Sequence, residues 1–118
     1  MNKFLTILLA MLSLLAVAAP CRAGGFCAIA YSTHTCRYGY GDGFNTRHGA
    51  ECTALNGCGA ADAQIVGWGH NEYVALARGS GSAWGCGVGT TRRSAECEAL
   101  ANCPSRNAYI VKWVYSFD

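Results

Sequence analysis

A segment that occurs twice constrains the fold of this chain more than any other feature of its sequence. The stretch TRHGAECTALNGC at residues 46–58 returns 45 residues later as TRRSAECEALANC at residues 91–103, with eight identical positions and both cysteines retained. The stretch AQIVGW at residues 63–68 returns at the same spacing as AYIVKW at residues 108–113. Such a duplication indicates two copies of one supersecondary unit.

Each copy is expected to contain a strand, a tight loop, a second strand, a helix and a third strand. The pair AIA and YGYG in the first half corresponds to ALA and WGCG in the second. We therefore predict an α+β fold of two tandem ββαβ repeats, residues 26–71 and 73–116, with a pseudo-twofold relation. Residues 24–118 are enough for one small domain.

The repeated segment itself predicts a helix of about 11 residues, which depends on tertiary packing for its stability. Thr46 and Thr91 are the expected N-caps. Gly57 and Asn102 occupy equivalent places near the end, and both residue types tolerate the left-handed conformation that ends helices.

The two hairpins are predicted to have one bulky face and one face of alanine and glycine, which lets another backbone element approach closely. The expected registers place Ile29 opposite Tyr38 and Leu76 opposite Trp84. On the third strands, Lys112 is expected on the solvent side, with Val66, Trp68, Val111 and Trp113 facing inward.

Residues 1–23 are predicted to be a cleaved signal peptide, because a basic start precedes an apolar run and a small-residue cleavage site. The mature chain would begin at Gly24 and be secreted or periplasmic, without membrane insertion after cleavage. The alternative is a lipoprotein acylated at Cys21. Removal of Lys3 and Arg22 leaves seven basic and seven acidic residues, so the basic footprint of a nucleic-acid-binding protein is absent.

Seven cysteines remain in the mature chain, and disulfides are their expected use in a small exported protein. Chain reversal at Gly57 and Asn102 would allow the local bridges Cys52–Cys58 and Cys97–Cys103, each worth about 2 kcal/mol. The competing arrangement, Cys52–Cys97 with Cys58–Cys103, would join the two helices.

The remaining cysteines lie on the bulky faces of the hairpins. We predict a Cys27–Cys86 bridge between the repeats and a free thiol at Cys36. No Cys-x-x-Cys or paired-histidine spacing indicates a metal site, and no cofactor is expected.

One stretch resembles an anion-binding loop, since a glycine run at residues 85–89 precedes Thr91, Arg92 and Arg93 at a helix start. The alternative interpretation is a glycine face that packs tightly on a neighbouring element.

No catalytic constellation is predicted. Glu51 and Glu96 each follow an arginine by four residues, which indicates ion pairs on the helix surface. The histidines His34, His48 and His70 are scattered over different predicted elements.

The stretches AIAYS, WGCGVGTTR, AECxALxxC and IVxW resemble a bacterial secreted family called domain of unknown function 4189. Members of that family often carry additional cysteines where this chain has Ala63 and the Glu72-Tyr73 region. The resemblance implies secretion and a compact α+β domain, and it implies no agreed activity and no catalytic residues.

The preferred function is non-enzymatic binding of an unidentified protein, as an inhibitor, an immunity factor or a host-directed factor. Aromatic residues that remain exposed after the core is built would favour such binding. The alternatives are a small exported enzyme or toxin that uses His34, His48 or the glutamates, and a structural component of the cell envelope.

Overall fold

The computed structural model describes residues 24–117; the predicted signal peptide and the acylation alternative at Cys21 lie outside the described residues. The chain is α+β, and its elements follow the order ββαβ twice. The elements are β1 (Phe26–Tyr31), β2 (Tyr38–Phe44), α2 (Arg47–Cys58), β3 (Gln64–His70), β4 (Tyr73–Arg78), β5 (Trp84–Gly89), α3 (Arg92–Asn102) and β6 (Tyr109–Tyr115).

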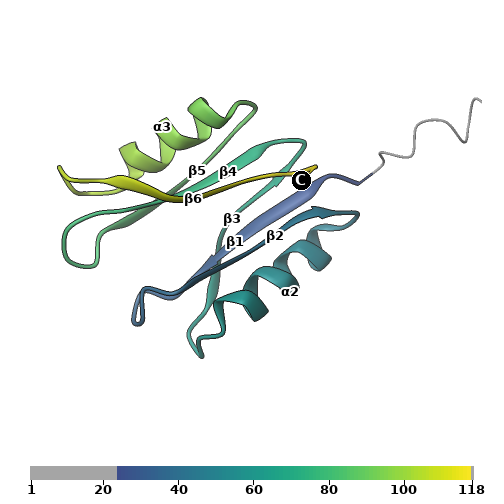
Figure 1. The fold of residues 1–118 in the computed structure, drawn as a ribbon, viewed down its shortest axis with the longest axis horizontal. Helices are drawn as coiled ribbons and strands as arrows, with labels where there is room; N and C mark the ends of the chain where they lie inside the picture. Colours follow the sequence, from purple (N-terminus) through teal and green to yellow (C-terminus); the bar gives the residue numbers. More distant parts are fainter. Residues whose placement is uncertain (1–23, 118) are drawn as a thin grey trace, which may run out of the picture.

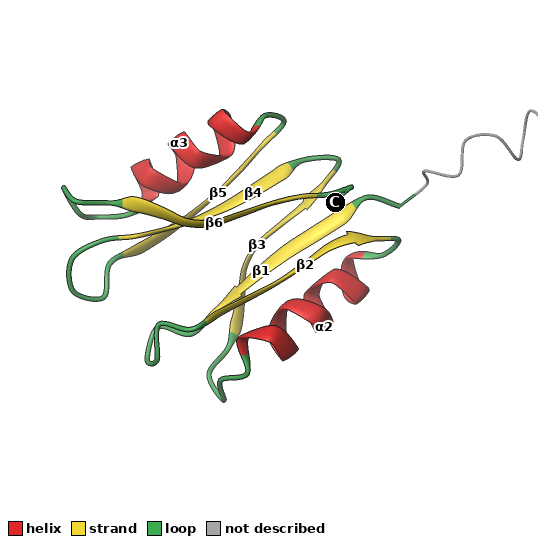
Figure 2. Ribbon diagram, in the orientation of Figure 1, coloured by secondary structure: helices red, strands yellow, loops and turns green. Residues whose placement is uncertain are grey.

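Each repeat forms its own three-stranded antiparallel sheet. The strand orders are β2-β1-β3 and β5-β4-β6. The first strand of each repeat is therefore central, with the second strand on one side of it and the third strand on the other. The two sheets lie face to face with one helix on each outer side, which makes four layers, helix–sheet–sheet–helix (Figure 1). Figure 2 shows the same layers by secondary structure.

Small residues bring each helix into close contact with its sheet, as the alanine and glycine face predicted. Ala28 and Ala30 on β1 and Ala50 and Ala54 on α2 are completely buried against one another. In the second repeat, a Cβ added at Gly85 would lie 2.5 Å from the backbone oxygen of Ala99. The helices therefore rest almost on the strand backbones, because the strand residues that face them are alanines and glycines.

The bulky faces of the two sheets form the central core. Its fully buried members come from the central strands and from β6, and Tyr31 packs its ring 5.6 Å from that of Trp84 across the two sheets. These members are Cys27, Ile29, Tyr31, Val74, Leu76 and Val114. Burial of these side chains between the sheets is the main contact that holds the two repeats together.

The predicted hairpin registers were wrong by two residues. Ile29 pairs with Tyr40, and Leu76 pairs with Cys86. In the first hairpin the loop is longer than expected because Ser32 N donates to the carbonyl of Arg37 at 2.9 Å and Cys36 takes a left-handed φ of 61°. A shift of two residues leaves each side chain on the same face, so the division into bulky and small faces was still correct.

A bulge corrects the predicted orientation of the tryptophans. Ile29 pairs with Gly67 whereas Ala30 pairs with Ile65, so Val66 is the extra residue on β3. The matching irregularity in the second sheet lies between Leu76 and Ala77. Beyond each bulge, the side chains point to the opposite face of the sheet from the one that strict alternation predicts. As a result, Trp68 and Trp113 lie on the helix side of their sheets, and not in the central core.

The N-terminal ends of both helices are as predicted. Thr46 Oγ1 accepts a hydrogen bond from Gly49 N at 3.0 Å, and Thr91 Oγ1 accepts one from Ser94 N at 3.1 Å. Each threonine has extended backbone angles, as an N-cap requires.

The predicted C-terminal ends were wrong. Helix α2 continues through Cys58 and ends at Gly59, which takes the left-handed φ of 65°. Gly57 lies within the helix, where its Cα faces Gly39 of β2. Asn102 is the last residue of α3, and its Nδ2 donates to the carbonyl of Cys86 at 2.8 Å. Both residues serve contacts with the neighbouring strand and do not reverse the chain.

Candidate functional site

An array of stacked side chains covers the outer face of the first sheet beside the start of α2. The Phe26 and His70 rings stack with centroids 4.3 Å apart, and Phe26 stacks on Trp68 at 6.4 Å. The guanidinium of Arg47 lies 4.0 Å above the Trp68 ring, and Arg47 Nε donates to Glu51 at 3.0 Å. We call His70, Phe26, Trp68 and Arg47 the first ladder.

The second repeat contains an equivalent array, the second ladder, of Tyr115, Tyr73, Trp113 and Arg92. Tyr73 stacks on Tyr115 at 4.3 Å and lies 5.9 Å from Trp113, while Arg92 lies 4.4 Å above Trp113. Arg92 Nε donates to Glu96 at 3.1 Å. The predicted ion pairs of both helices are confirmed, and each arginine also forms a cation–π contact that the helix sequence did not indicate.

The ladders are exposed because each helix packs mainly on the hairpin strands and leaves the third strand open. Trp68 is 38% exposed, and His70 and Arg47 are exposed as well. In the second ladder Trp113 and Tyr115 are only partly exposed, and Phe117 packs beside Tyr115 with ring centroids 5.7 Å apart. The first ladder is therefore the more accessible of the two.

Both ladders lie at the same end of the molecule, where β1 begins and β3 and β6 end (Figure 1). A backbone hydrogen bond connects this end across the repeats, since Gly43 N donates to Ser116 O at 3.1 Å. Within the first repeat, Asn71 N donates to Gly25 O at 2.9 Å. Both helices also begin here, so aromatic rings and arginines share one end of the molecule.

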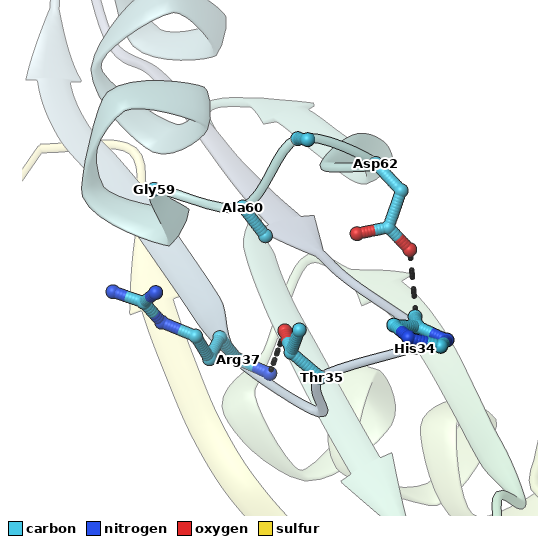
Figure 3. Close-up of a pocket in the computed structure, with 7 residues that line it drawn as sticks. His34, Thr35, Arg37, Gly59, Ala60 and Asp62 are labelled. Carbon is cyan, nitrogen blue, oxygen red and sulfur yellow. Dashed lines mark hydrogen bonds between the residues drawn. The ribbon is translucent and has the colours of Figure 1, made fainter.

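A pocket of about 560 Å³ lies at the opposite end, between the first hairpin loop and the loop after α2 (Figure 3). Its lining residues are His34, Thr35, Arg37, Gly59, Ala60, Ala61 and Asp62. Figure 3 shows Arg37 and Asp62 on either side of it.

Polar contacts beside this pocket connect the two loops. Ser32 Oγ donates to Asp62 Oδ1 at 2.6 Å, and Thr35 Oγ1 donates to Ser32 Oγ at 2.8 Å. The hydrogen bond from Ser32 lowers the pKa of Asp62. Because Ser32 is completely buried, its hydroxyl holds the two loops together and is not open to a substrate.

The structure does not bring the remaining catalytic candidates together. Of the three histidines, His34 lines the pocket, His48 lies on α2 and His70 stacks on Phe26. Glu51 and Glu96 lie on helices on opposite outer sides of the molecule. The convergence in a cleft that would favour an enzyme is not found among residues 24–117.

Two of the three residues of the anion-binding candidate are engaged within the protein. Thr91 caps the helix, and Arg92 is held by Glu96 and Trp113; Arg93 is exposed. Glycines of the preceding run lie against α3, and a Cβ at Gly89 would come 2.6 Å from Ser94 Oγ. The structure thus favours the packing interpretation of the glycine run.

The local disulfides do not fit this structure, in which the seven cysteines of residues 24–117 are all free thiols. Cys52 and Cys58 belong to one continuous helix, about 9 Å apart along its axis, with Cys52 exposed and Cys58 buried. Cys97 is likewise exposed on α3, and Cys103 is buried just after that helix ends. In each pair one thiol is exposed and the other is buried, so neither bridge can close without unwinding a helix.

The other cysteine predictions have different outcomes. Cys27 and Cys86 lie in the same central core, where they approach β3 near Gly69 and Gly67 respectively. The side chain of Val74 packs at both of these glycines, and the two thiols are not bridged. Burial raises the pKa of the Cys27 thiol and raises that of Cys86 to about 12. Cys36 is a free thiol in the hairpin loop.

Within residues 24–117, no group of three or more His, Cys, Asp or Glu side chains is placed to hold a metal ion. The helices of this part of the chain are too short or too polar to cross a membrane.

Comparison with known proteins identifies one family. The sequence profile described as Domain of unknown function (DUF4189) matches residues 26–115. No curated protein and no solved structure matches the chain.

Proposed function

This chain belongs to the DUF4189 family, and from that premise we propose that it is an exported, non-enzymatic protein that binds another protein through the first ladder. The observation that carries the proposal is the exposed Trp68, which lies between Arg47 and Phe26 with contacts to both. Tryptophan and arginine are the residues most enriched among those that dominate protein–protein binding energies.

The ladder is suited to binding because its side chains are already ordered. Glu51 holds Arg47, Arg47 lies on Trp68, and Phe26 is stacked between Trp68 and His70. A partner would therefore immobilise few side chains, which lowers the entropic cost of association. Covering the exposed 38% of a side chain of about 250 Å² contributes roughly 2 kcal/mol at 25 cal/mol/Å².

Charge supports a protein as the partner. The mature chain carries seven basic and seven acidic residues and is neutral overall, and Arg47 at the ladder is paired with an acidic side chain. Nucleic-acid binding depends on a surplus of basic groups that release counterions. An aromatic surface with a single, ion-paired arginine fits a protein surface better.

The test is a comparison of exposed aromatic residues at the two ends of the molecule. The mature protein is immobilised, proteins from the exported fraction of the producing cell are retained on it, and the affinity of each isolated partner is measured by calorimetry. Trp68→Ala should weaken binding at least about thirtyfold, since truncation of a central anchor costs about 2 kcal/mol or more. Tyr109→Ala is the matched control, because Tyr109 is 54% exposed but lies at the start of β6, away from the ladder.

Two results would count against the proposal. A partner that loses affinity for both variants equally would indicate general adhesion to exposed aromatic side chains. A partner that binds Trp68→Ala as well as the unaltered protein would place the binding surface elsewhere.

A further inference from the structure

An exposed thiol and an imidazole lie one helical turn apart on the outer face of α2. Cys52 Sγ is 3.4 Å from His48 Nε2 and 4.0 Å from His48 Nδ1. Both side chains are exposed, and the remaining cysteine of this helix, Cys58, is buried. Residues four apart on a helix share a face, so the pair is a consequence of the helical spacing.

The second repeat provides a natural comparison at the equivalent place. Cys97 is exposed on α3 just as Cys52 is on α2. The residue one turn before Cys97 is Arg93, and a guanidinium donates hydrogen bonds but does not accept a proton. The two helices thus carry the same exposed thiol, once beside a potential base and once beside a cation, whose charge favours a thiolate but which takes up no proton.

We propose that Cys52 is a site of thiol–disulfide exchange with small-molecule disulfides, and that His48 is the base that activates it. His48 accepts the proton of the Cys52 thiol, and the thiolate attacks one sulfur of the disulfide. The bond between Cys52 and that sulfur forms as the disulfide bond breaks. The other half leaves as a thiolate and takes up the proton, so one mixed disulfide and one free thiol result.

The surroundings of the pair permit this reaction. An attacking thiolate must approach the disulfide in line, and the exposed Cys52 on α2 is open to a reagent. By contrast, Cys27 and Cys58 are completely buried. Because the pair is surrounded by water, we expect a rate gain of about threefold to tenfold, well below the 10²–10⁴ that positioned acid–base groups provide in enzyme sites.

The experiment measures the reaction of each cysteine with glutathione disulfide. The mature protein is reduced, freed of reductant, mixed with excess glutathione disulfide, quenched with acid at intervals and digested for peptide mapping. In the unaltered protein, Cys52 should form its mixed disulfide about threefold to tenfold faster than Cys97. His48→Ala and His48→Gln should both lower the Cys52 rate to about that of Cys97, since neither side chain is a base.

The reciprocal variant separates the role of a base from a merely structural role. Arg93→His places an imidazole one turn before Cys97, and the Cys97 rate should rise about threefold or more while the Cys52 rate is unchanged. Circular dichroism of each variant checks that the helices are intact, and iodoacetamide provides a second reagent for the same ranking.

Equal rates at Cys52 and Cys97 in the unaltered protein would overturn the proposal. So would an unchanged Cys52 rate in both His48 variants, or an unchanged Cys97 rate in a folded Arg93→His protein. None of these results depends on whether the first ladder binds a protein.

Discussion

The closeness of α3 to its sheet predicts that a single methyl group at Gly85 will destabilise the protein. An added Cβ would lie 2.5 Å from the backbone oxygen of Ala99 and 2.5 Å from the backbone nitrogen of Cys103. An ordinary contact needs 3.4 Å or more, so the methyl group is about 0.9 Å too close. Because both neighbours are backbone atoms, no change of side-chain rotamer can relieve the contact.

The cost of Gly85→Ala follows from the movement that it requires. The last turn of α3 must retreat by about 1 Å, and such overpacking costs about 1–3 kcal/mol. The same retreat strains the hydrogen bond from Asn102 to Cys86 O, worth about 1 kcal/mol. Reduced freedom of the unfolded chain offsets about 0.4–1 kcal/mol. The net loss is about 1–4 kcal/mol, or roughly 4–30 °C in melting temperature for a domain of this size.

Gly57→Ala is the matched control and should have the opposite sign. Gly57 lies inside α2, and a Cβ there would be 3.4 Å from Gly39 Cα and 3.7 Å from Tyr40 N, both ordinary contacts. The second repeat already carries Asn102 at the equivalent place. Alanine stabilises a helix interior by about 0.5–1 kcal/mol relative to glycine, so the melting temperature should rise by a few degrees.

Thermal and urea unfolding of both variants, followed by circular dichroism in reducing buffer, measures these changes. A Gly85→Ala protein within about 0.5 kcal/mol of the unaltered protein would refute the argument from close packing. A Gly57→Ala protein destabilised by more than about 1 kcal/mol would indicate that Gly57 needs a left-handed conformation after all.

Three further predictions follow from the same structure, and a fourth follows from the sequence. Ser116→Ala should cost about 1–3 kcal/mol in urea unfolding, because the buried Ser116 Oγ accepts from Glu72 N at 2.9 Å and donates to Glu72 O at 2.8 Å. Burial raises the pKa of the Cys86 thiol from 9.0 in the unfolded chain to about 12 in the folded state. The contribution of this protonated thiol to stability is therefore complete below pH 9. That contribution is lost as the pH rises towards 12, by no more than about 1.4 kcal/mol per pH unit, and urea unfolding of Cys86→Ala at alkaline pH should lack this part of the slope. Non-reducing peptide mapping of the exported protein should recover neither a Cys52–Cys58 nor a Cys97–Cys103 linkage. Intact-mass measurement should place the first residue of the exported protein at Gly24, and a diacylglycerol on Cys21 would contradict this.

Features that depend on near neighbours in the chain were predicted from the sequence correctly. Thr46 and Thr91 cap their helices, and each arginine one residue later pairs with the glutamate four residues on. Capping and helix-face pairing need only the helix itself, so the spacing of residues is sufficient to predict them.

Features that depend on contacts between elements were predicted less well. Gly57 and Asn102 looked like helix ends, but Gly57 lies inside α2 beside Gly39, and Asn102 donates to the Cys86 carbonyl of the neighbouring strand. The bulges that turn Trp68 and Trp113 towards the helix side leave no signal in the alternation of residues. The ladders were missed for the same reason, although the shared Arg-to-Trp spacing of the two repeats could have indicated them.

The sequence by itself determined the order of the elements, the duplication and the division of each hairpin into a bulky and a small face, because these follow from local periodicity and residue size. The tertiary structure alone decided that the bulky faces of the two sheets pack against each other. That packing buries Cys27 completely and Cys86 partly, whereas Cys52 and Trp68, on the outer sides, remain accessible. The physical reason is that burial depends on which surfaces pack against one another, and those surfaces are built by residues far apart in the chain.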